Sequence, residues 1–215
     1  MIQCVVFDLD GTLINTLEDL TDAANDVLKE YGYPTHDVDA IQAMVGHGGF
    51  ALMKLALPEG KNSDLETKNA FEKFKSSYEK RMTNKTKPYE GIKKLLTELK
   101  NRDIPIAVHT NKPQFAATEI VRYLFSEFSF VDVIGYRSEE TKKPNPHFTL
   151  EIANKAGVDP QNCLFVGDSF PDYETGKNAG MKVVLVTWGF RNRKHLAQKK
   201  DAILIDHPID LLAFL

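Results

Sequence analysis

Short apolar runs alternate with longer amphipathic stretches from Pro88 onward, and this alternation restricts the fold more than any other feature of the sequence. The apolar runs are too brief for helices and rich in Val, Ile and Phe, which is typical of buried strands. The amphipathic stretches repeat apolar residues at helical spacing, and two of them end at a glycine, a common stop signal. Strands and helices alternating at this pitch predict an α/β fold with a parallel sheet covered by helices. The predicted strands are Gln3–Leu9, Ile104–His109, Val131–Tyr136, Cys163–Val166 and Val183–Thr187, and the predicted helices lie near residues 92–99, 115–124, 147–156 and 172–179.

The segment 15–85 interrupts this alternation. Its apolar residues repeat at helical spacing, and no predicted strand follows them. Within it, Ser63 and Glu66 form a capping-box pair, which predicts that another helix begins there. We therefore expect an α/β domain made of residues 1–14 and 86–215, with a separate helical domain inserted between its first and second strands.

The composition favours a globular chain that binds neither nucleic acid nor membrane. The 27 basic and 30 acidic residues give a net charge of −3, which argues against general nucleic-acid binding. The longest apolar run, Leu211–Leu215, is far shorter than the ~20 residues of a membrane span, and no basic segment marks a secretory signal. Cys4 and Cys163 lie in apolar runs and are interpreted as buried reduced thiols. We expect a soluble, cytoplasmic protein.

Polar side chains follow the predicted strands at the point where each strand ends. The carboxyl ends of parallel strands meet at one edge of a sheet, where ligands bind in open α/β folds. We therefore expect carboxylates, a hydroxyl, an amide and an ammonium to share one cleft. These residues are Asp8, Asp10, Gly11 and Thr12 after the first strand, Thr110 and Asn111 after the second, Lys142 and Lys143 after the third, and Asp168, Ser169 and Asp172 after the fourth.

Carboxylates gathered in one small cleft repel one another unless a cation lies among them. Oxygen ligands of this kind suit Mg²⁺, and no His or Cys cluster has the spacing of a zinc site. A lysine and a hydroxyl that face the same point suit the oxygens of a phosphoryl group. A carboxylate can also act as the nucleophile. The pattern therefore predicts Mg²⁺-dependent phosphoryl transfer, with Lys142 and Lys143 both able to reach the cleft.

Four segments taken together resemble the motifs of the haloacid dehalogenase superfamily. The inserted helical segment likewise resembles the cap that this superfamily carries between its first and second motifs, and the family fold is a Rossmann-like parallel sheet between layers of helices. Three further segments, VGHGGFAL, PYEG and TWGF, are similar to the phosphoglycolate phosphatase-like enzymes of that superfamily. The four motif segments are FDLDGTL at 7–13, TN at 110–111, KP at 143–144 and GDSFPD at 167–172.

The resemblance implies a two-step hydrolysis of a phosphate monoester. Asp8 would attack phosphorus and become an aspartyl-phosphate. Asp10 would protonate the leaving alkoxide and then deprotonate the water that hydrolyses this intermediate. Mg²⁺ would be held by Asp8, by the backbone carbonyl of Asp10 and by Asp168.

The resemblance also assigns residues to the phosphate. Thr110 and the backbone amide of Asn111 would hold phosphoryl oxygens, and Lys143, rather than the lysine before it, would balance their charge. Asp172, which shares a motif with Ser169, would orient Lys143 or a water molecule at the metal. Three ionised aspartates and a phosphate dianion total about −5, against about +3 from Mg²⁺ and one lysine, so backbone N–H groups are expected to compensate the rest.

Three features remain open to a functional or an ordinary structural interpretation. The turn formed by Gly46, His47, Gly48 and Gly49 offers backbone N–H groups that could meet a small anion, but it also suits a plain helix–turn–helix loop. His47 is either a surface residue or a substrate contact. The basic run 191–200 either steers anionic substrates or forms a solvated face.

Several other activities stay compatible with the sequence. Within the superfamily these are phosphoglucomutases, phosphonate-cleaving enzymes (Lys54 lies near the position of their lid lysine), pyrophosphatases, and nucleotide or sugar phosphatases. Outside enzymes, a phospho-acceptor signalling domain or an inactive binding protein would share part of the pattern. The Asp8 and Asp10 pair argues for an enzyme, because the second carboxylate supplies an acid and base that a slow signalling domain lacks. We expect a small phosphorylated metabolite as partner and a monomer or homodimer.

Overall fold

The chain folds into two units, and it crosses between them in two short strands. The computed structural model describes residues 1–215. One unit joins Met1–Asn15 to Pro88–Leu215, and the other is Thr16–Lys87. The crossings fall one and two residues later than the sequence predicts. They lie in β2 (Ile14–Asn15) and β3 (Lys87–Pro88), which form a sheet of their own.

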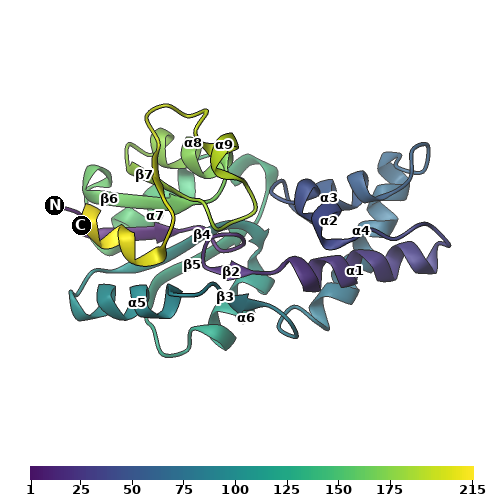
Figure 1. Cartoon of the computed structure of the whole chain (residues 1–215), viewed down its shortest axis with the longest axis horizontal. Helices are drawn as coiled ribbons and strands as arrows, with labels where there is room; N and C mark the ends of the chain where they lie inside the picture. The colour runs from purple at the N-terminus through teal and green to yellow at the C-terminus, as the bar shows by residue number, and fades with distance from the viewer. The chain divides into compact units, whose positions relative to one another are not determined.

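A six-stranded parallel sheet organises the first unit, which confirms the predicted α/β fold (Figure 1). The strand order is β5-β4-β1-β6-β7-β8, so the chain builds outward from β1 in one direction and then in the other. Every residue of β1 and β6 is buried, as expected for central strands covered on both faces. The strands are β1 Cys4–Phe7, β4 Ile106–Pro113, β5 Phe130–Tyr136, β6 Cys163–Gly167, β7 Lys182–Val186 and β8 Ile203–Ile205.

Helices cover both faces of this sheet. The helices α5 and α6 lie on one side of it, and α8 and α9 lie on the other (Figure 1). Cys4 and Val6 of β1 pack with Phe148 and Ile152 of α7 in one buried cluster, because alternate side chains of a strand point to opposite faces. The helices are α5 Ile92–Asn101, α6 Gln114–Leu124, α7 His147–Ala156, α8 Phe170–Asn178 and α9 Arg193–Leu196, and the 3₁₀ turns are Glu139–Thr141, Pro160–Asn162 and Pro208–Phe214.

The second unit consists of helices. The predicted capping box is present at the start of α4, where the Ser63 backbone N–H donates to Glu66 (3.2 Å) and the Glu66 N–H donates back to the Ser63 hydroxyl (3.4 Å). Further along α4, the buried rings of Phe74 and Tyr78 stack with their centroids 5.8 Å apart, so this aromatic seam is core of the unit. The helices are α1 Leu17–Glu30, α2 Val38–Met44, α3 Gly49–Ala56 and α4 Asp64–Glu79.

A buried carboxylate ties the beginning of the second unit to its end. Asp19, in the first turn of α1, accepts hydrogen bonds from the backbone N–H groups of Lys85 (3.0 Å) and Thr86 (2.8 Å) and from the Thr86 hydroxyl (2.7 Å). The sequence separation of these residues hides the contact from local pattern analysis.

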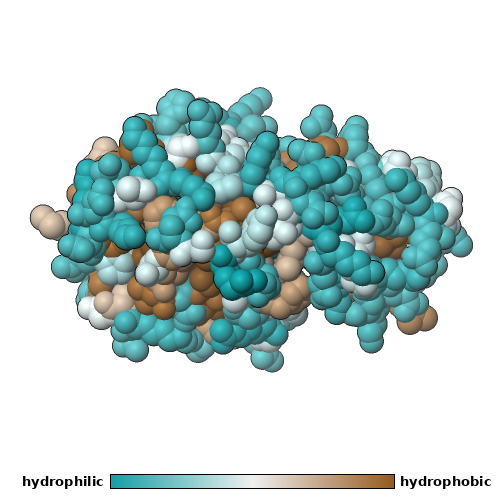
Figure 2. Space-filling view, turned by 90° about the horizontal axis from the view of Figure 1, so that it is seen from below, coloured by the Kyte–Doolittle hydropathy of each residue, from teal (hydrophilic) through white to brown (hydrophobic).

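No helix in the structure is both long enough and apolar enough to cross a bilayer. On the face seen in Figure 2, hydrophobic residues show among hydrophilic ones, which is common on globular domains. Both cysteines are buried and free, as predicted.

Candidate active site

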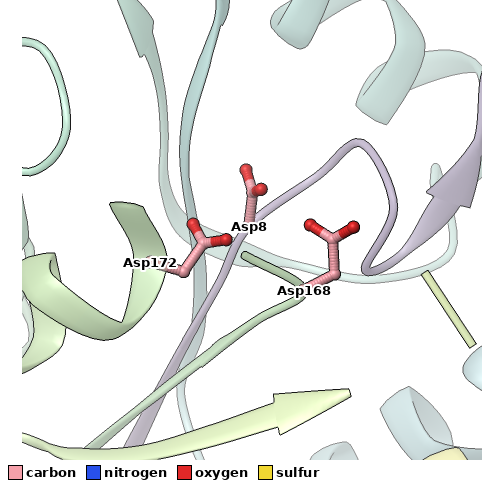
Figure 3. Close-up of side chains that lie close together, drawn as sticks. All are labelled: Asp8, Asp168 and Asp172. Atoms are coloured by element: carbon pink, nitrogen blue, oxygen red, sulfur yellow. The ribbon is translucent and has the colours of Figure 1, made fainter. Parts of the chain in front are cut away.

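The strand order places the site at the carboxyl end of β1. In sheets of this order, the direction of winding reverses beside the first strand, and the crevice outside the carboxyl ends there is the usual ligand site. The residues directly beyond β1 and β6 include Asp8 and Asp168, and Asp172 lies in the first turn of α8. Figure 3 shows these three side chains close together. One carboxylate oxygen from each lies within 4.8 Å of the others, and all three residues are buried.

Lys143 lies among these carboxylates. Its ammonium is 2.9 Å from Asp8 and 2.6 Å from Asp172. Burial raises the pKa of Asp8 to about 7, and the nearby charge of Asp172 adds to this, while Lys143 opposes it. Burial disfavours the charge of Lys143 itself, but Asp172 and Asp8 outweigh that effect and raise its pKa. The neighbouring Lys142 instead lies 3.3 Å from the exposed Glu139, so only the second of the two candidate lysines enters the cluster.

Glycines make room for the carboxylate of Asp168. A Cβ on Gly11, whose φ is +83°, would lie 2.3 Å from the Asp168 carboxylate, and a Cβ on Gly189 would lie 2.3 Å from the Gly11 carbonyl oxygen. The backbone N–H of Phe190 donates to Asp168 at 2.7 Å. Burial raises the pKa of Asp168 well above its usual value, and the charges of Asp172 and Asp8 add to the increase. The turn at Gly11 and the loop at Gly189 and Phe190, which are far apart in the sequence, thus both lie against the Asp168 carboxylate.

Ser169 holds Asp172 at the start of α8. Its backbone N–H donates to one Asp172 oxygen at 3.0 Å, its hydroxyl donates to the same oxygen, and the other oxygen faces Lys143. A Cβ on Gly167 would lie 2.2 Å from the Cβ of Asp172, so glycine is required for this close approach. The predicted arrangement of Asp172 beside Lys143 is therefore present in the structure.

The end of β4 contributes Thr110 and Asn111. The Thr110 hydroxyl accepts a hydrogen bond from the Lys112 backbone N–H at 3.3 Å. The Asn111 side-chain oxygen accepts from the backbone N–H of Lys143 at 2.9 Å. Asn111 thus links β4 to the loop that carries Lys143, a side-chain contact that the sequence does not predict.

Lys112 is a site residue that the sequence analysis missed. Its ammonium lies 3.0 and 3.1 Å from the two carboxylate oxygens of Asp10, and its side chain is buried. The Asp10 carboxylate therefore pairs with Lys112, and it is not among the three carboxylates grouped above. The sequence feature that could have indicated Lys112 is its position directly after Thr110 and Asn111, in a strand that continues to Pro113.

The charges of the cluster fit a hard divalent cation. The four carboxylates of Asp8, Asp10, Asp168 and Asp172 carry −4 when ionised, and Lys112 and Lys143 supply +2, which leaves −2. Oxygen donors with this net charge suit an ion such as Mg²⁺. The raised pKa values of Asp8 and Asp168 indicate the same need, because burial disfavours their ionised forms unless a cation is close.

Two aromatic residues lie beside the site. The Trp188 indole N–H donates to the Thr12 carbonyl oxygen at 3.0 Å, and Phe190 contacts Asp168 as described above.

In the basic run 191–200, Arg193 pairs with Asp206 at 2.5 Å and Lys199 with Glu174 at 3.2 Å. These ion pairs favour a solvated face for that run.

The glycine-rich turn lies in the second unit, between α2 and α3. Gly46 and Gly48 have φ values of +115° and +90°, and Gly48 is the N-cap of α3. A Cβ on Gly49 would lie 2.8 Å from the ring of Phe71, so a larger residue there would have to displace that ring. His47 is exposed. These facts explain the glycines structurally and leave a role in substrate binding as a prediction.

Known proteins resemble this chain along nearly its whole length. Residues 5–186 match the family described as haloacid dehalogenase-like hydrolase. Phosphoglycolate phosphatase 1 of Pseudomonas aeruginosa is 31% identical over 98% of this chain and 78% of its own length. Phosphoglycolate phosphatase of Haemophilus influenzae is 30% identical over 99% of this chain and 98% of its own length. The crystal structure of a Lactobacillus delbrueckii subsp. bulgaricus protein superposes with a TM-score of 0.89 at 29% identity, covering 97% of this chain and 96% of that one. The chain belongs to the haloacid dehalogenase-like hydrolase family.

Proposed function

We propose that this protein hydrolyses small phosphate monoesters with Mg²⁺ as cofactor, and that phosphoglycolate is the preferred substrate. The observation that carries the proposal is the buried cluster in which Lys143 lies between Asp8 and Asp172 and beside Asp168. Membership of a hydrolase family and the names of the relatives support the reaction class and the substrate.

Asp8 is the proposed nucleophile. Lys143 contacts its Oδ1 at 2.9 Å, and the Leu9 backbone N–H donates to the same oxygen at 2.7 Å, so the carboxylate has a fixed orientation. Attack on phosphorus forms an aspartyl-phosphate and releases the alkoxide, and hydrolysis of this ester restores Asp8. Lys143 offsets the negative charge of the transferring group in a buried site, where such an interaction is strong.

Asp10 is the proposed acid and base. It gives a proton to the leaving oxygen in the first step and takes one from water in the second. Asp8, Asp168 and the backbone carbonyl of Asp10 would hold Mg²⁺, which would supply positive charge at the phosphoryl oxygens. Thr110 and the Asn111 backbone amide bind the remaining oxygens, while Asp172 and Ser169 position Lys143.

The inserted helical unit is the proposed cap, which selects the leaving group. The turn at Gly46–Gly49 presents backbone N–H groups, and positive φ values at Gly46 and Gly48 make its conformation specific. Such groups suit a small anion like the carboxylate of phosphoglycolate. We include His47 in this turn as a candidate contact, and we place the enzyme in the cytoplasm as a monomer or homodimer.

A phosphate-release screen tests the proposal. The substrates are phosphoglycolate, ethyl phosphate, a sugar phosphate, a nucleotide and pyrophosphate, each with and without Mg²⁺, with Asp8→Asn as the inactive control. We expect Mg²⁺-dependent release, with the highest kcat/KM for phosphoglycolate. A low rank for phosphoglycolate would refute the substrate and leave the reaction class intact. No turnover of any ester would refute the reaction class and favour a binding protein.

A further inference from the structure

Lys112 is a buried cation that the proposed phosphate chemistry does not use. Its side chain is 3% exposed, and a lysine this buried requires a partner for its charge. That partner is Asp10, whose two carboxylate oxygens lie 3.0 and 3.1 Å from the ammonium. The ammonium therefore restrains both oxygens of the Asp10 carboxylate.

The end of β4 is built to hold Lys112 in place. The register between β4 and β5 shifts between His109 and Pro113, so the strand is irregular where Lys112 lies. A Cβ on Gly135 of β5 would lie 2.7 Å from the Lys112 carbonyl oxygen, so the two backbones are unusually close. The Gln114 side chain bridges this region by accepting from the Gly135 N–H at 2.9 Å and donating to the Val133 carbonyl at 2.8 Å.

Asp10, in contrast, lies on a turn whose backbone contacts do not fix its side chain. The Leu9 carbonyl accepts from the Leu13 N–H at 2.9 Å, and the Gly11 N–H donates to the Ile14 carbonyl at 2.9 Å. These bonds close the turn, but they do not involve the Asp10 side chain, which is 22% exposed. Lys112 supplies the contact that sets where the carboxyl group lies.

We propose that Lys112 is a positioning residue that holds the Asp10 carboxyl group for proton transfer at the leaving oxygen. The proposal rests on the proposed function, since it requires Asp10 to act as acid and base there. Lys112 itself gives and takes no proton in this role. Its loss should therefore matter only when the leaving group needs a proton.

Three substrates separate this role from the alternatives. Ethyl phosphate releases a strongly basic alkoxide, which needs a proton from Asp10. Acetyl phosphate is similar in size but releases acetate, which does not. Phosphoglycolate needs the proton and also carries a carboxylate that a lysine could bind directly. The value of kcat/KM covers binding and all steps up to transfer of the phosphoryl group, so it reports the leaving-group effect.

We expect Lys112→Met to lower kcat/KM about 10- to 100-fold for ethyl phosphate and phosphoglycolate, within the range that general acid catalysis contributes. The value for acetyl phosphate should change less than about threefold, since a good leaving group needs little acid assistance. Lys112→Arg, which keeps the positive charge, should recover part of the loss. If the methionine variant does not fold, the arginine variant is used for the same comparison of substrates. Lys142→Met is the matched control at an exposed ion pair and should behave like the wild type.

A double-mutant cycle adds a second readout. If Lys112 acts through Asp10, adding Lys112→Met to Asp10→Asn should lower kcat/KM for ethyl phosphate by less than about threefold further. Equal losses for all three substrates, or fully additive losses in the cycle, would overturn the proposal. A loss for phosphoglycolate alone would also overturn it and make Lys112 a ligand of the substrate carboxylate. Wild-type protein that hydrolyses none of the three would instead refute the proposed function.

Discussion

The ammonium of Lys143 lies 2.9 Å from the carboxylate of Asp8, and both side chains are buried. The same ammonium lies 2.6 Å from Asp172. Removing one partner from a buried ion pair leaves an uncompensated charge and costs about 3–5 kcal/mol. Lys143→Ala should therefore lower the free energy of unfolding by about this amount and abolish phosphate release, because both aspartates lose their counter-charge.

Urea unfolding and phosphate-release assays check this prediction. Lys142→Ala is the control, because that lysine pairs with the exposed Glu139 and an exposed pair contributes only about 0–1 kcal/mol. The assignment of Lys143 is wrong if the Lys142 variant is the inactive one.

Asp8→Asn should leave the fold intact and stop catalysis. The amide has the shape of the carboxylate but is a very weak nucleophile, so kcat should fall by at least about 10⁴-fold. Burial and Asp172 disfavour the ionised form of Asp8, and the Lys143 ammonium keeps Asp172 as its partner at 2.6 Å, so the neutral amide should not destabilise the metal-free protein. Thermal unfolding and single-turnover phosphate release with Mg²⁺ measure both effects. Turnover like that of the wild type would remove Asp8 as the nucleophile.

Much of this site follows from local sequence patterns. The apolar run before Asp8 predicts a buried strand, and the Gly after residue 156 predicts where α7 ends, so the strand ends that carry Asp8 and Asp168 could be located in advance. Once the sheet is parallel, its geometry brings those ends together. The fold class and the grouping of the carboxylates therefore depend on patterns that act over a few residues.

Other parts of the site depend on contacts between distant segments. The sequence predicts that the second strand ends at His109, but β4 continues to Pro113 through an irregular register, and this brings Lys112 to Asp10. The bond from the Phe190 N–H to Asp168 likewise joins residues on two different loops. The edge strand β8 spans only three residues, too few to show a periodic pattern.

Mg²⁺ should stabilise the protein more at neutral pH than at acidic pH. In the metal-free protein, the pKa of Asp8 is raised to about 7 by burial and by Asp172. A carboxyl group with a raised pKa binds its proton more tightly in the folded state, so its contribution to stability is largest below pH ~4 and is lost as the pH rises to about 7. Bound Mg²⁺ should offset this loss, because it compensates the ionised carboxylates.

Thermal unfolding with and without Mg²⁺ tests this linkage. At a Mg²⁺ concentration about 100 times its Kd, binding stabilises by about 2.7 kcal/mol, and we expect a clearly smaller gain at about pH 5 than at about pH 8. Chelation of the metal should also abolish phosphate release. Equal stabilisation at both pH values would contradict the assigned ligands.

His109 should make the protein less stable in acid. Burial lowers the pKa of His109 to about 3, with a smaller effect from the charge of Lys143. The unfolded chain binds a proton at this residue below pH ~6.5, whereas the folded protein does not until about pH 3. The stability contribution of the neutral ring is therefore complete above pH ~6.5 and is lost as the pH falls toward 3, by about 1.4 kcal/mol per pH unit.

The variant His109→Asn isolates this effect. The ring nitrogen Nδ1 lies 2.7 Å from the Thr149 hydroxyl, and an amide can replace that contact without titrating. Between about pH 7 and about pH 5.5, the free energy of unfolding should fall by about 1 kcal/mol less in the variant than in the wild type. Parallel pH profiles for the two proteins would show that His109 titrates normally in the folded state.

Asp19 should be essential for the stability of the inserted unit. Its carboxylate accepts four hydrogen bonds of 2.7–3.2 Å from Lys85 and Thr86, three at Oδ2 and one at Oδ1, and it is 1% exposed. Each hydrogen bond to a charged group contributes about 1.5–3 kcal/mol. Asn would remove the negative charge from these bonds and replace the Oδ1 acceptor with an N–H donor that faces the Lys85 N–H. Asp19→Asn should therefore destabilise this unit by about 2–4 kcal/mol, chiefly by releasing residues 85–86 from the start of α1.

Hydrogen exchange and urea unfolding measure this effect. The backbone amides of Lys85 and Thr86 should lose protection in Asp19→Asn, while those of β1 and β6 should keep it, because the parallel sheet belongs to the other unit. Asp22→Asn, which removes one partner of the exposed ion pair with Lys85, is the matched control and should cost less than about 1 kcal/mol. Equal destabilisation by the two substitutions would show that the charge of this helix end matters, and not the hydrogen bonds of Asp19.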